Sequence, residues 1–197
     1  MSASARRSQL LDLAEGLFTE LGYERVSIED VARAADVTRP VVYQHFDGKE
    51  ALFIACVRRA RDQFEADLAE AVLGASGDLS DLIEVGGRVF FQVLADDPRR
   101  WALLFATSSS IDGELSEQLS ALRSQTIASI AELCRPFAPN VPEDDLSALA
   151  HAISGVGEQL GRWWLRNPEL TLEDVVRQHR RMCTACAMAT LAAFEPQ

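Results

Sequence analysis

The side chains best suited to chemistry in this chain lie close together between residues 38 and 49. Arg39 carries a planar guanidinium that donates parallel hydrogen bonds, and Gln44 carries an amide that donates and accepts. Arg39 matches the major-groove edge of guanine, Gln44 matches that of adenine, and Val41 offers methyl groups to the thymine methyl. This set predicts recognition of base edges in double-stranded DNA.

Polar residues around this set favour contacts to the phosphate backbone. Ser27 and Thr38 are expected at helix starts, where hydroxyl and amide donors suit phosphate oxygens. Lys49 is the only lysine in the chain, and we expect it at another helix start, where the helix dipole adds to its charge. Pro40 is tolerated only in a first turn, where no backbone donor is required, and it should stiffen the start of the reading helix.

Three rings follow in the same segment. Tyr43 and His45 suit phosphate contacts. The alternatives are that Tyr43 is a core aromatic and that His45 is a solvated side chain. Phe46 is expected in the core. The predicted DNA-contacting residues are therefore Ser27, Thr38, Arg39, Pro40, Val41, Tyr43, Gln44, His45 and Lys49.

Short helices joined by a turn must hold these side chains in place. The segment 27–30, Ser-Ile-Glu-Asp, has the pattern of a capping box that opens a helix. Asp36 then falls in a turn, and the next helix begins near Thr38 or Arg39. A second cap signal at residues 47–50 opens a helix of about 25 residues, whose buried stripe begins at Leu52. This arrangement is typical of a helix-turn-helix that reads the major groove.

Residues 4–54 resemble the N-terminal domain of the tetracycline-repressor (TetR) family of bacterial transcription regulators. The matching pieces are GYERVSIEDVARAADVTRPVVYQHF and DGKEAL. The resemblance implies a homodimeric repressor that a small-molecule effector releases from a palindromic operator. Pro40 departs from the family pattern, in which glycine or another small or polar residue is common. That departure bears on which bases are read and not on whether DNA is bound.

Helical periodicity over nearly the whole chain predicts an all-α protein of about nine helices. We expect a three-helix DNA-binding domain over residues 1–48 and a larger effector-binding and dimerisation domain over residues 49–197. The net charge of −11 falls in the second part, because residues 1–61 carry nine basic and nine acidic side chains. No apolar run approaches the roughly 20 residues that cross a membrane, which favours a cytoplasmic protein.

The middle of the chain is rich in aromatic residues. Ordinary core packing explains most of them, yet the family resemblance implies a small-molecule cavity, and apolar walls with few polar groups suit such a site. The effector is unknown, and no other cofactor is expected. The candidate effector-contacting residues are Phe91, Leu94, Trp101, Phe105, Ser109, Gln125, Glu158, Gln159 and Trp163.

Two long helices, from about residue 143 to 166 and from 171 to 194, predict the dimer interface. Gly155, Gly157 and Gly161 permit close helix approach, which would compensate for the cost of glycine in a helix. Two such helices from each subunit would form a four-helix interface with twofold symmetry. The two DNA-binding domains would then meet half-sites about 34–36 Å apart.

Three alternative functions depend on other residues of the chain. An enzyme would need a convergent catalytic set, whereas the three histidines lie far apart in sequence and no catalytic or metal-binding motif accompanies them. A helical interaction module with a vestigial reading domain would not need Arg39, Tyr43 and Lys49. The pair Cys183 and Cys186 is either a redox or metal site or two small buried side chains on one helix face.

Overall fold

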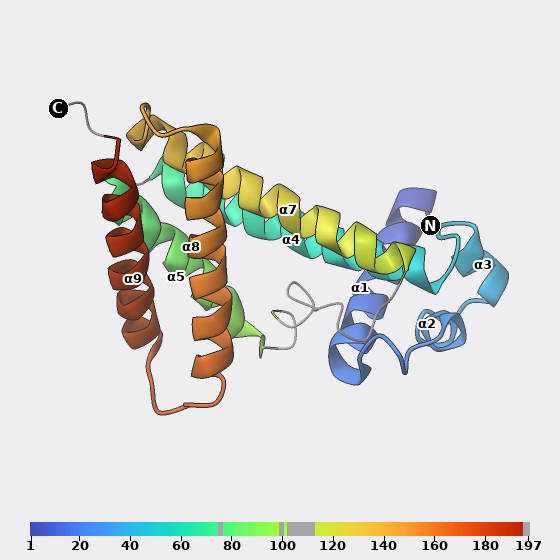
Figure 1. Ribbon diagram of the computed structural model, residues 1–197. Coiled ribbons are helices and arrows are strands. Elements are labelled where there is room, and N and C mark those ends of the chain that lie inside the picture. The colour runs from blue at the N-terminus through green and yellow to red at the C-terminus, as the bar shows by residue number, and fades with distance from the viewer. Residues whose placement is uncertain (75–76, 99–100, 102–112, 195–197) are drawn as a thin grey trace. The chain divides into compact units, whose positions relative to one another are not determined.

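The structure is a computed structural model that describes residues 1–74, 77–98, 101 and 113–194. These residues form α-helices and one short 3₁₀ helix, and no strand occurs among them (Figure 1). The all-α prediction is therefore confirmed. Eight α-helices are described against about nine expected, and the helix expected over residues 99–108 lies outside the described residues apart from Trp101.

The described helices follow one another along the chain. Their bounds are α1 (Ala3–Leu21), α2 (Ile28–Ala34), α3 (Arg39–Tyr43), α4 (Lys49–Leu73), α5 (Leu79–Asp96), α7 (Glu114–Cys134), η2 (Arg135–Phe137), α8 (Glu143–Trp164) and α9 (Leu172–Ala192). The 25 residues of α4 match the length expected from its apolar stripe. None of the described helices is long and apolar enough to span a bilayer.

The chain divides into two compact units. The first comprises Met1–Asp62 with Arg99–Ser120, and the second comprises Gln63–Pro98 with Ala121–Gln197. Both α4 and α7 contribute residues to each unit. The predicted boundary between residues 48 and 49 divides the chain by expected function, with the DNA-reading helices before it and the effector-binding and dimerisation domain after it. That boundary stays a prediction.

In the first unit, α1 and α4 bury apolar stripes at helical spacing. Leu10, Ala14 and Phe18 of α1 are buried, and the ring of Phe18 meets Phe53 of α4 edge to face at 5.0 Å between centroids. Gly22 ends α1 with a backbone φ of 81°, a value that side chains rarely tolerate. Packing of these stripes provides the base on which the two shorter helices rest.

The turn between α2 and α3 is a Schellman motif that ends α2. The amide of Val37 donates to the carbonyl of Ala32 at 3.0 Å, and the amide of Asp36 donates to that of Arg33 at 3.2 Å. Asp36 has a φ of 52°, and it is the only residue other than glycine with a positive φ in the described part of the chain. Aspartate tolerates this left-handed conformation better than most residues, although glycine adopts it more easily.

Asp36→Gly is accordingly expected to stabilise the first unit by about 0.5 kcal/mol, because it relieves the left-handed strain. The measurement is urea denaturation of the wild type and the variant. The control is Ala34→Gly, an exposed helical position where glycine should cost about 1 kcal/mol. If Asp36→Gly were the less stable protein, the aspartate side chain would be contributing a stabilising interaction of its own.

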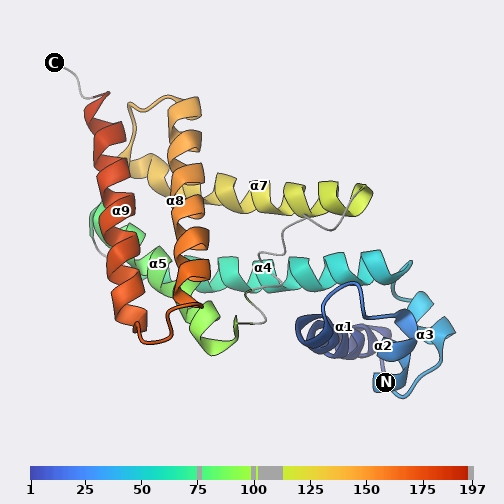
Figure 2. The same ribbon diagram turned by 60° about the horizontal axis from the view of Figure 1, so that its bottom comes forward.

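In the second unit, α9 packs against both α5 and α8, and Figure 2 shows these three helices side by side. Asp78 caps α5 through its side chain, and a capping box between Thr171 and Asp174 opens α9. Hydrogen bonds from the Thr171 hydroxyl and backbone lower the pKa of the Asp174 carboxyl. These local signals fix where the helices begin, and burial of their apolar faces fixes how they pack.

Glycines at the centre of this unit make room for His179 of α9. A Cβ atom added to Gly87 would lie 2.5 Å from His179 Nδ1, and one added to Gly157 would meet Phe90 at 3.6 Å. The close helix approach expected at Gly157 thus occurs within one chain, against Phe90 of α5. A Cβ at Gly155 would meet nothing within 4 Å, so the structure gives that residue no close neighbour.

The two C-terminal cysteines differ in environment. Cys183 is buried, and burial raises the pKa of its thiol to about 12, whereas Cys186 is exposed. Both are free thiols. The interpretation as two buried side chains holds for Cys183 alone. In the part of the chain that the structure describes, no group of three potential metal ligands occurs.

Candidate nucleic-acid interface

Helix α3 is anchored through one side and presents the other to solvent. Val42 is fully buried, and Phe46, three residues beyond the helix, is also buried. The residues exposed around this anchor are Thr38, Arg39, Pro40, Tyr43 and Gln44, while Val41 and His45 are partly exposed. The prediction that Phe46 is a core residue is confirmed, and every residue predicted on α3 to read DNA has accessible surface.

The start of α3 leaves donors free for a ligand. Thr38 is the N-cap residue, yet its side chain makes no capping hydrogen bond. Pro40 lies in the first turn, where its missing amide hydrogen removes no helical bond. Tyr43 is 47% exposed, which excludes the alternative that it is a core aromatic. An aromatic hydroxyl at this position can donate to a phosphate oxygen.

Arg39 is accessible and weakly paired. Its Nε atom lies 3.6 Å from the Glu29 carboxylate of α2, and the two side chains are 57% and 53% exposed. Exposed pairs of this kind contribute little stability. The guanidinium is therefore held near the surface of α2 while its remaining donors stay available for a base edge. Sequence reasoning missed Glu29, and the only available signal was an acidic residue in the helix preceding the turn.

Glu29→Gln is expected to strengthen DNA binding by up to about fivefold per subunit. It removes a negative charge that competes with DNA for Arg39, and an exposed pair of this kind is worth at most about 1 kcal/mol. Fluorescence anisotropy with a labelled duplex measures the effect. Glu20→Gln, the same change at an exposed position on α1, is the matched control. An equal gain in both variants would show that only net charge matters.

Lys49 and Ser27 have structural contacts that the sequence did not reveal. Lys49 Nζ donates to the backbone carbonyl of Glu24 at 3.1 Å and lies 4.2 Å from the ring centroid of Tyr23. Ser27 forms both halves of the capping box with Asp30, and its hydroxyl donates to that carboxylate at 2.6 Å. These bonds lower the pKa of Asp30. Both residues thus stabilise the local structure around α2 and the start of α4. Phosphate contacts from Ser27 and Lys49 stay a prediction.

The residues predicted to contact an effector do not share one environment. Phe91, Leu94 and Trp101 are buried, and the Phe91 ring packs edge to face against Trp164 and His179. Glu158, which is also buried, pairs with Arg123 at 2.5 Å. The exposed members of the set are Gln125, Gln159 and Trp163, and Phe105 and Ser109 lie outside the described residues. His179 was not predicted, although a histidine within an apolar stripe was visible in the sequence.

A short helix with an anchored inner side and an exposed polar side, held by a turn against a preceding helix, defines the helix-turn-helix class of DNA-binding proteins. Comparison with known protein families supports this assignment to the helix-turn-helix class. Residues 10–56 match the bacterial regulatory proteins of the tetR family, and residues 78–186 match the tetracyclin repressor-like C-terminal domain. The chain belongs to the TetR family, and it is a DNA-binding transcriptional regulator, not an enzyme.

Individual relatives support the same family. The chain is 24% identical over 162 residues to the HTH-type transcriptional activator FasR of Mycolicibacterium smegmatis, covering 82% of this chain and 73% of the relative. It is 25% identical to the probable acrEF/envCD operon repressor of Escherichia coli K12, over 82% of this chain and 76% of that protein. A tetR-family transcriptional regulator from Streptomyces coelicolor has a similar fold, with a TM-score of 0.75, 21% identity and coverage of 99% and 85%.

Proposed function

We propose that the protein is a homodimeric repressor that acts in the cytoplasm and reads a palindromic operator through α3 of each subunit. The observation that carries this proposal is the exposed side of α3, where Arg39, Tyr43 and Gln44 are accessible around the buried Val42. Ser27, Thr38, Pro40, Val41, His45 and Lys49 complete the proposed contact set. An activator is the alternative, since one relative is an activator and another a repressor.

Selection of bound sequences from random duplex DNA tests this proposal. We expect enrichment of a palindrome with half-sites about one helical turn apart, because a twofold dimer presents two reading helices at that spacing. The sign of regulation follows from a reporter gene placed behind the selected sequence. If refolded protein, stripped of any bound molecule, enriches no sequence at moderate salt, the proposal of a sequence-specific regulator is wrong.

Dimerisation is proposed through α8 and α9. Large apolar side chains on these helices and directly after α8 are exposed in the single chain, namely Trp163, Leu165, Met182 and Met188. These side chains offer apolar surface that a partner subunit would cover on binding. A second copy would pair these helices into a four-helix arrangement with twofold symmetry.

The double variant Met182→Glu, Met188→Glu is expected to be monomeric, because it would bury four uncompensated carboxylates in the dimer interface. Sedimentation velocity measures the change in mass. Ala128→Glu, at an exposed position of α7, is the control and should remain dimeric. A variant that sediments with the wild type would place the interface elsewhere, and a monomeric wild type would exclude the proposed dimer.

The proposed effector binds in the C-terminal part of the chain and favours a state whose DNA-binding domains are wrongly spaced for the operator. The match of residues 78–186 to a repressor-like C-terminal domain supports this role. The rings of Phe91 and Trp164 would supply apolar contacts to the effector, and the Arg123–Glu158 pair would supply charged groups. Gln125, Gln159 and Trp163 remain candidate contacts at the surface. Phe105 and Ser109, which lie outside the described residues, also remain candidates.

A further inference from the structure

Helix α2 begins with two acidic residues whose side chains have different environments. Asp30 completes the capping box, where its carboxylate accepts hydrogen bonds from the amide and hydroxyl of Ser27, and it pairs with Arg33 at 3.3 Å. Glu29 takes no part in the capping box. Among the described residues, its only ion pair is the 3.6 Å contact to Arg39 of α3, and its side chain is 53% exposed. Local structure therefore accounts for Asp30 and not for the carboxylate of Glu29 beside the reading helix.

An exposed carboxylate at this position has a cost for DNA binding. Helices α2 and α3 lie next to each other (Figure 1), so a groove that receives α3 brings its phosphates near Glu29. Repulsion between a carboxylate and the phosphates lowers affinity for every sequence. The carboxylate becomes favourable only where the groove presents a hydrogen-bond donor, and those donors are the amino groups of cytosine and adenine. Such a residue contributes selectivity more than affinity.

The neighbouring guanidinium indicates which donor fits. Arg39 matches guanine, whose major-groove edge presents two acceptors. In a G·C pair a hydrogen bond of about 2.9 Å joins the guanine O6 atom to the cytosine amino nitrogen, so protein groups that bind these two atoms must lie next to each other. The Arg39 Nε atom and the Glu29 carboxylate lie 3.6 Å apart, and both side chains are more than half exposed. This cation and anion therefore match the acceptors and the donor of one G·C pair.

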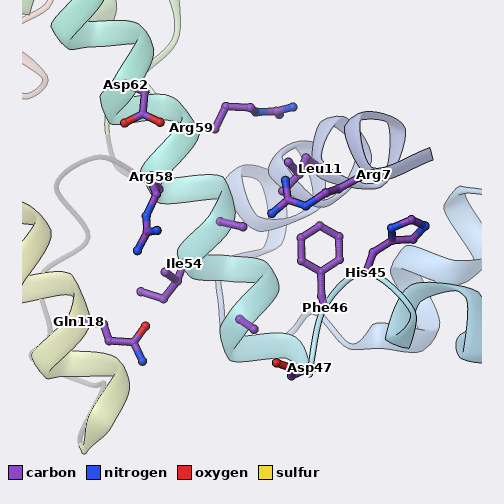
Figure 3. Close-up of a pocket in the computed structure, with 12 residues that line it drawn as sticks. Arg7, Leu11, His45, Phe46, Asp47, Ile54, Arg58, Arg59, Asp62 and Gln118 are labelled. Carbon is purple, nitrogen blue, oxygen red and sulfur yellow. The ribbon is translucent and has the colours of Figure 1, made fainter. Parts of the chain in front are cut away.

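The charge arrangement just beyond the other end of α3 is different. There Arg7 of α1 lies 4.8 Å from the centroid of the neutral Phe46 ring, and Figure 3 shows it beside Phe46 and His45. A cation held against an aromatic ring keeps its positive charge and suits a phosphate oxygen. A cation paired with an anion suits a base pair instead, because the edge of a base pair presents both acceptors and a donor. The distribution of charge thus favours base reading at the start of α3.

We propose that Glu29 is a specificity-determining residue, which accepts a hydrogen bond from the amino group of the cytosine that pairs with the guanine read by Arg39. Glu29 and Arg39 then read both bases of one G·C pair in each half-site. Bases that present an acceptor at that position leave the carboxylate without a donor and are rejected. This inference rests on the proposed reading of an operator by α3, and it adds α2 to the base-reading surface.

A modified operator tests the contact. N4-Methylcytosine still pairs with guanine, but a methyl group replaces the amino hydrogen that faces the major groove. The base pair to modify is the one whose preference is lost when sequences are selected with Arg39→Lys. Anisotropy with modified and unmodified operators then gives a ratio of dissociation constants for each protein. We expect the wild type to bind the modified operator at least about tenfold more weakly per half-site, because a hydrogen bond to a charged acceptor is lost.

Substitution of Glu29 separates this contact from other effects of the methyl group. Glu29→Ala should bind the two operators with nearly equal affinity. Glu20→Ala, the same change at an exposed position of α1, should keep the wild-type ratio. The ratio cancels any general gain in affinity from removal of a negative charge, so it is independent of the gain expected for Glu29→Gln. Circular dichroism checks that each variant keeps its helices.

Three results would overturn the inference and leave the proposed function intact. Equal binding of both operators by the wild type would show that no group contacts that amino hydrogen. An equal penalty in the wild type and Glu29→Ala would assign the effect to the methyl group itself or to another residue. A base pair other than G·C at the position that depends on Arg39 would exclude the paired reading. If selection enriches no operator at all, the proposed function fails together with this inference.

Discussion

Arg39→Ala is expected to weaken binding to the selected operator by about 30-fold to 10⁴-fold. A bidentate arginine–guanine contact provides about 1–3 kcal/mol of discrimination, and a dimer makes it twice. The fold should not change, because Arg39 is exposed and its only ion pair in the described residues is the 3.6 Å contact to Glu29. Anisotropy titrations of wild type and variant, with circular dichroism as the folding check, measure both effects.

Two further variants separate base reading from charge. Arg39→Lys keeps the positive charge and loses the planar pair of donors, so nonspecific affinity should be retained and preference at one base pair of each half-site should be lost. Arg33→Ala removes another exposed positive charge, from α2, where the side chain pairs with Asp30 at 3.3 Å. If Arg33→Ala and Arg39→Ala reduced affinity equally, Arg39 would contribute only charge and would not read a base.

The second large effect is a loss of stability in mild acid that originates at His179. The ring is only 4% exposed, and its Nδ1 atom has no hydrogen-bond partner among the described residues. Burial lowers the pKa of His179 from 6.5 to about 4, and a hydrogen bond to the backbone of Ile153 opposes this only partly. The aromatic ring of Phe91, 5.6 Å away between centroids, offers no negative charge to a protonated imidazole.

The direction of the pH effect follows from proton uptake. Between pH 6.5 and 4 the unfolded chain binds a proton at this histidine and the folded chain does not, so stability falls as the pH falls through that window. The full contribution is about 3 kcal/mol. Asp30, Glu173 and Asp174 have lowered pKa values, so their contributions are lost at more acidic pH than that of His179. Urea denaturation in steps from pH 7.5 to 4 measures the slope.

Substituting His179 separates its contribution to the pH dependence of stability from the contributions of other titrating groups. His179→Leu removes the titrating ring and should flatten the stability profile between pH 6.5 and 4, whatever its effect on stability at neutral pH. His151→Gln, which alters an exposed histidine of α8, should leave the slope as in the wild type. A slope that persists in His179→Leu would assign the acid sensitivity to other groups.

Local patterns in the sequence correctly predicted most helix boundaries. The capping box at Ser27 and Asp30 is present, α4 runs from Lys49 for 25 residues, and Phe46 is buried as predicted. Such signals depend on residues three or four positions apart, whose geometry is fixed once the backbone is helical. The DNA-binding family could be predicted for the same reason, because the reading motif is one continuous segment.

Only the tertiary structure decided the contacts between distant residues. Lys49 donates to the carbonyl of Glu24 across the first unit, and Arg39 lies beside Glu29. Gly87 accommodates His179, although 92 positions of sequence separate them, because α5 and α9 approach closely at that point. The sequence alone determined the helices and the reading motif. Helix packing decided which polar groups are paired, free or buried, since those states depend on approach distances that no local pattern encodes.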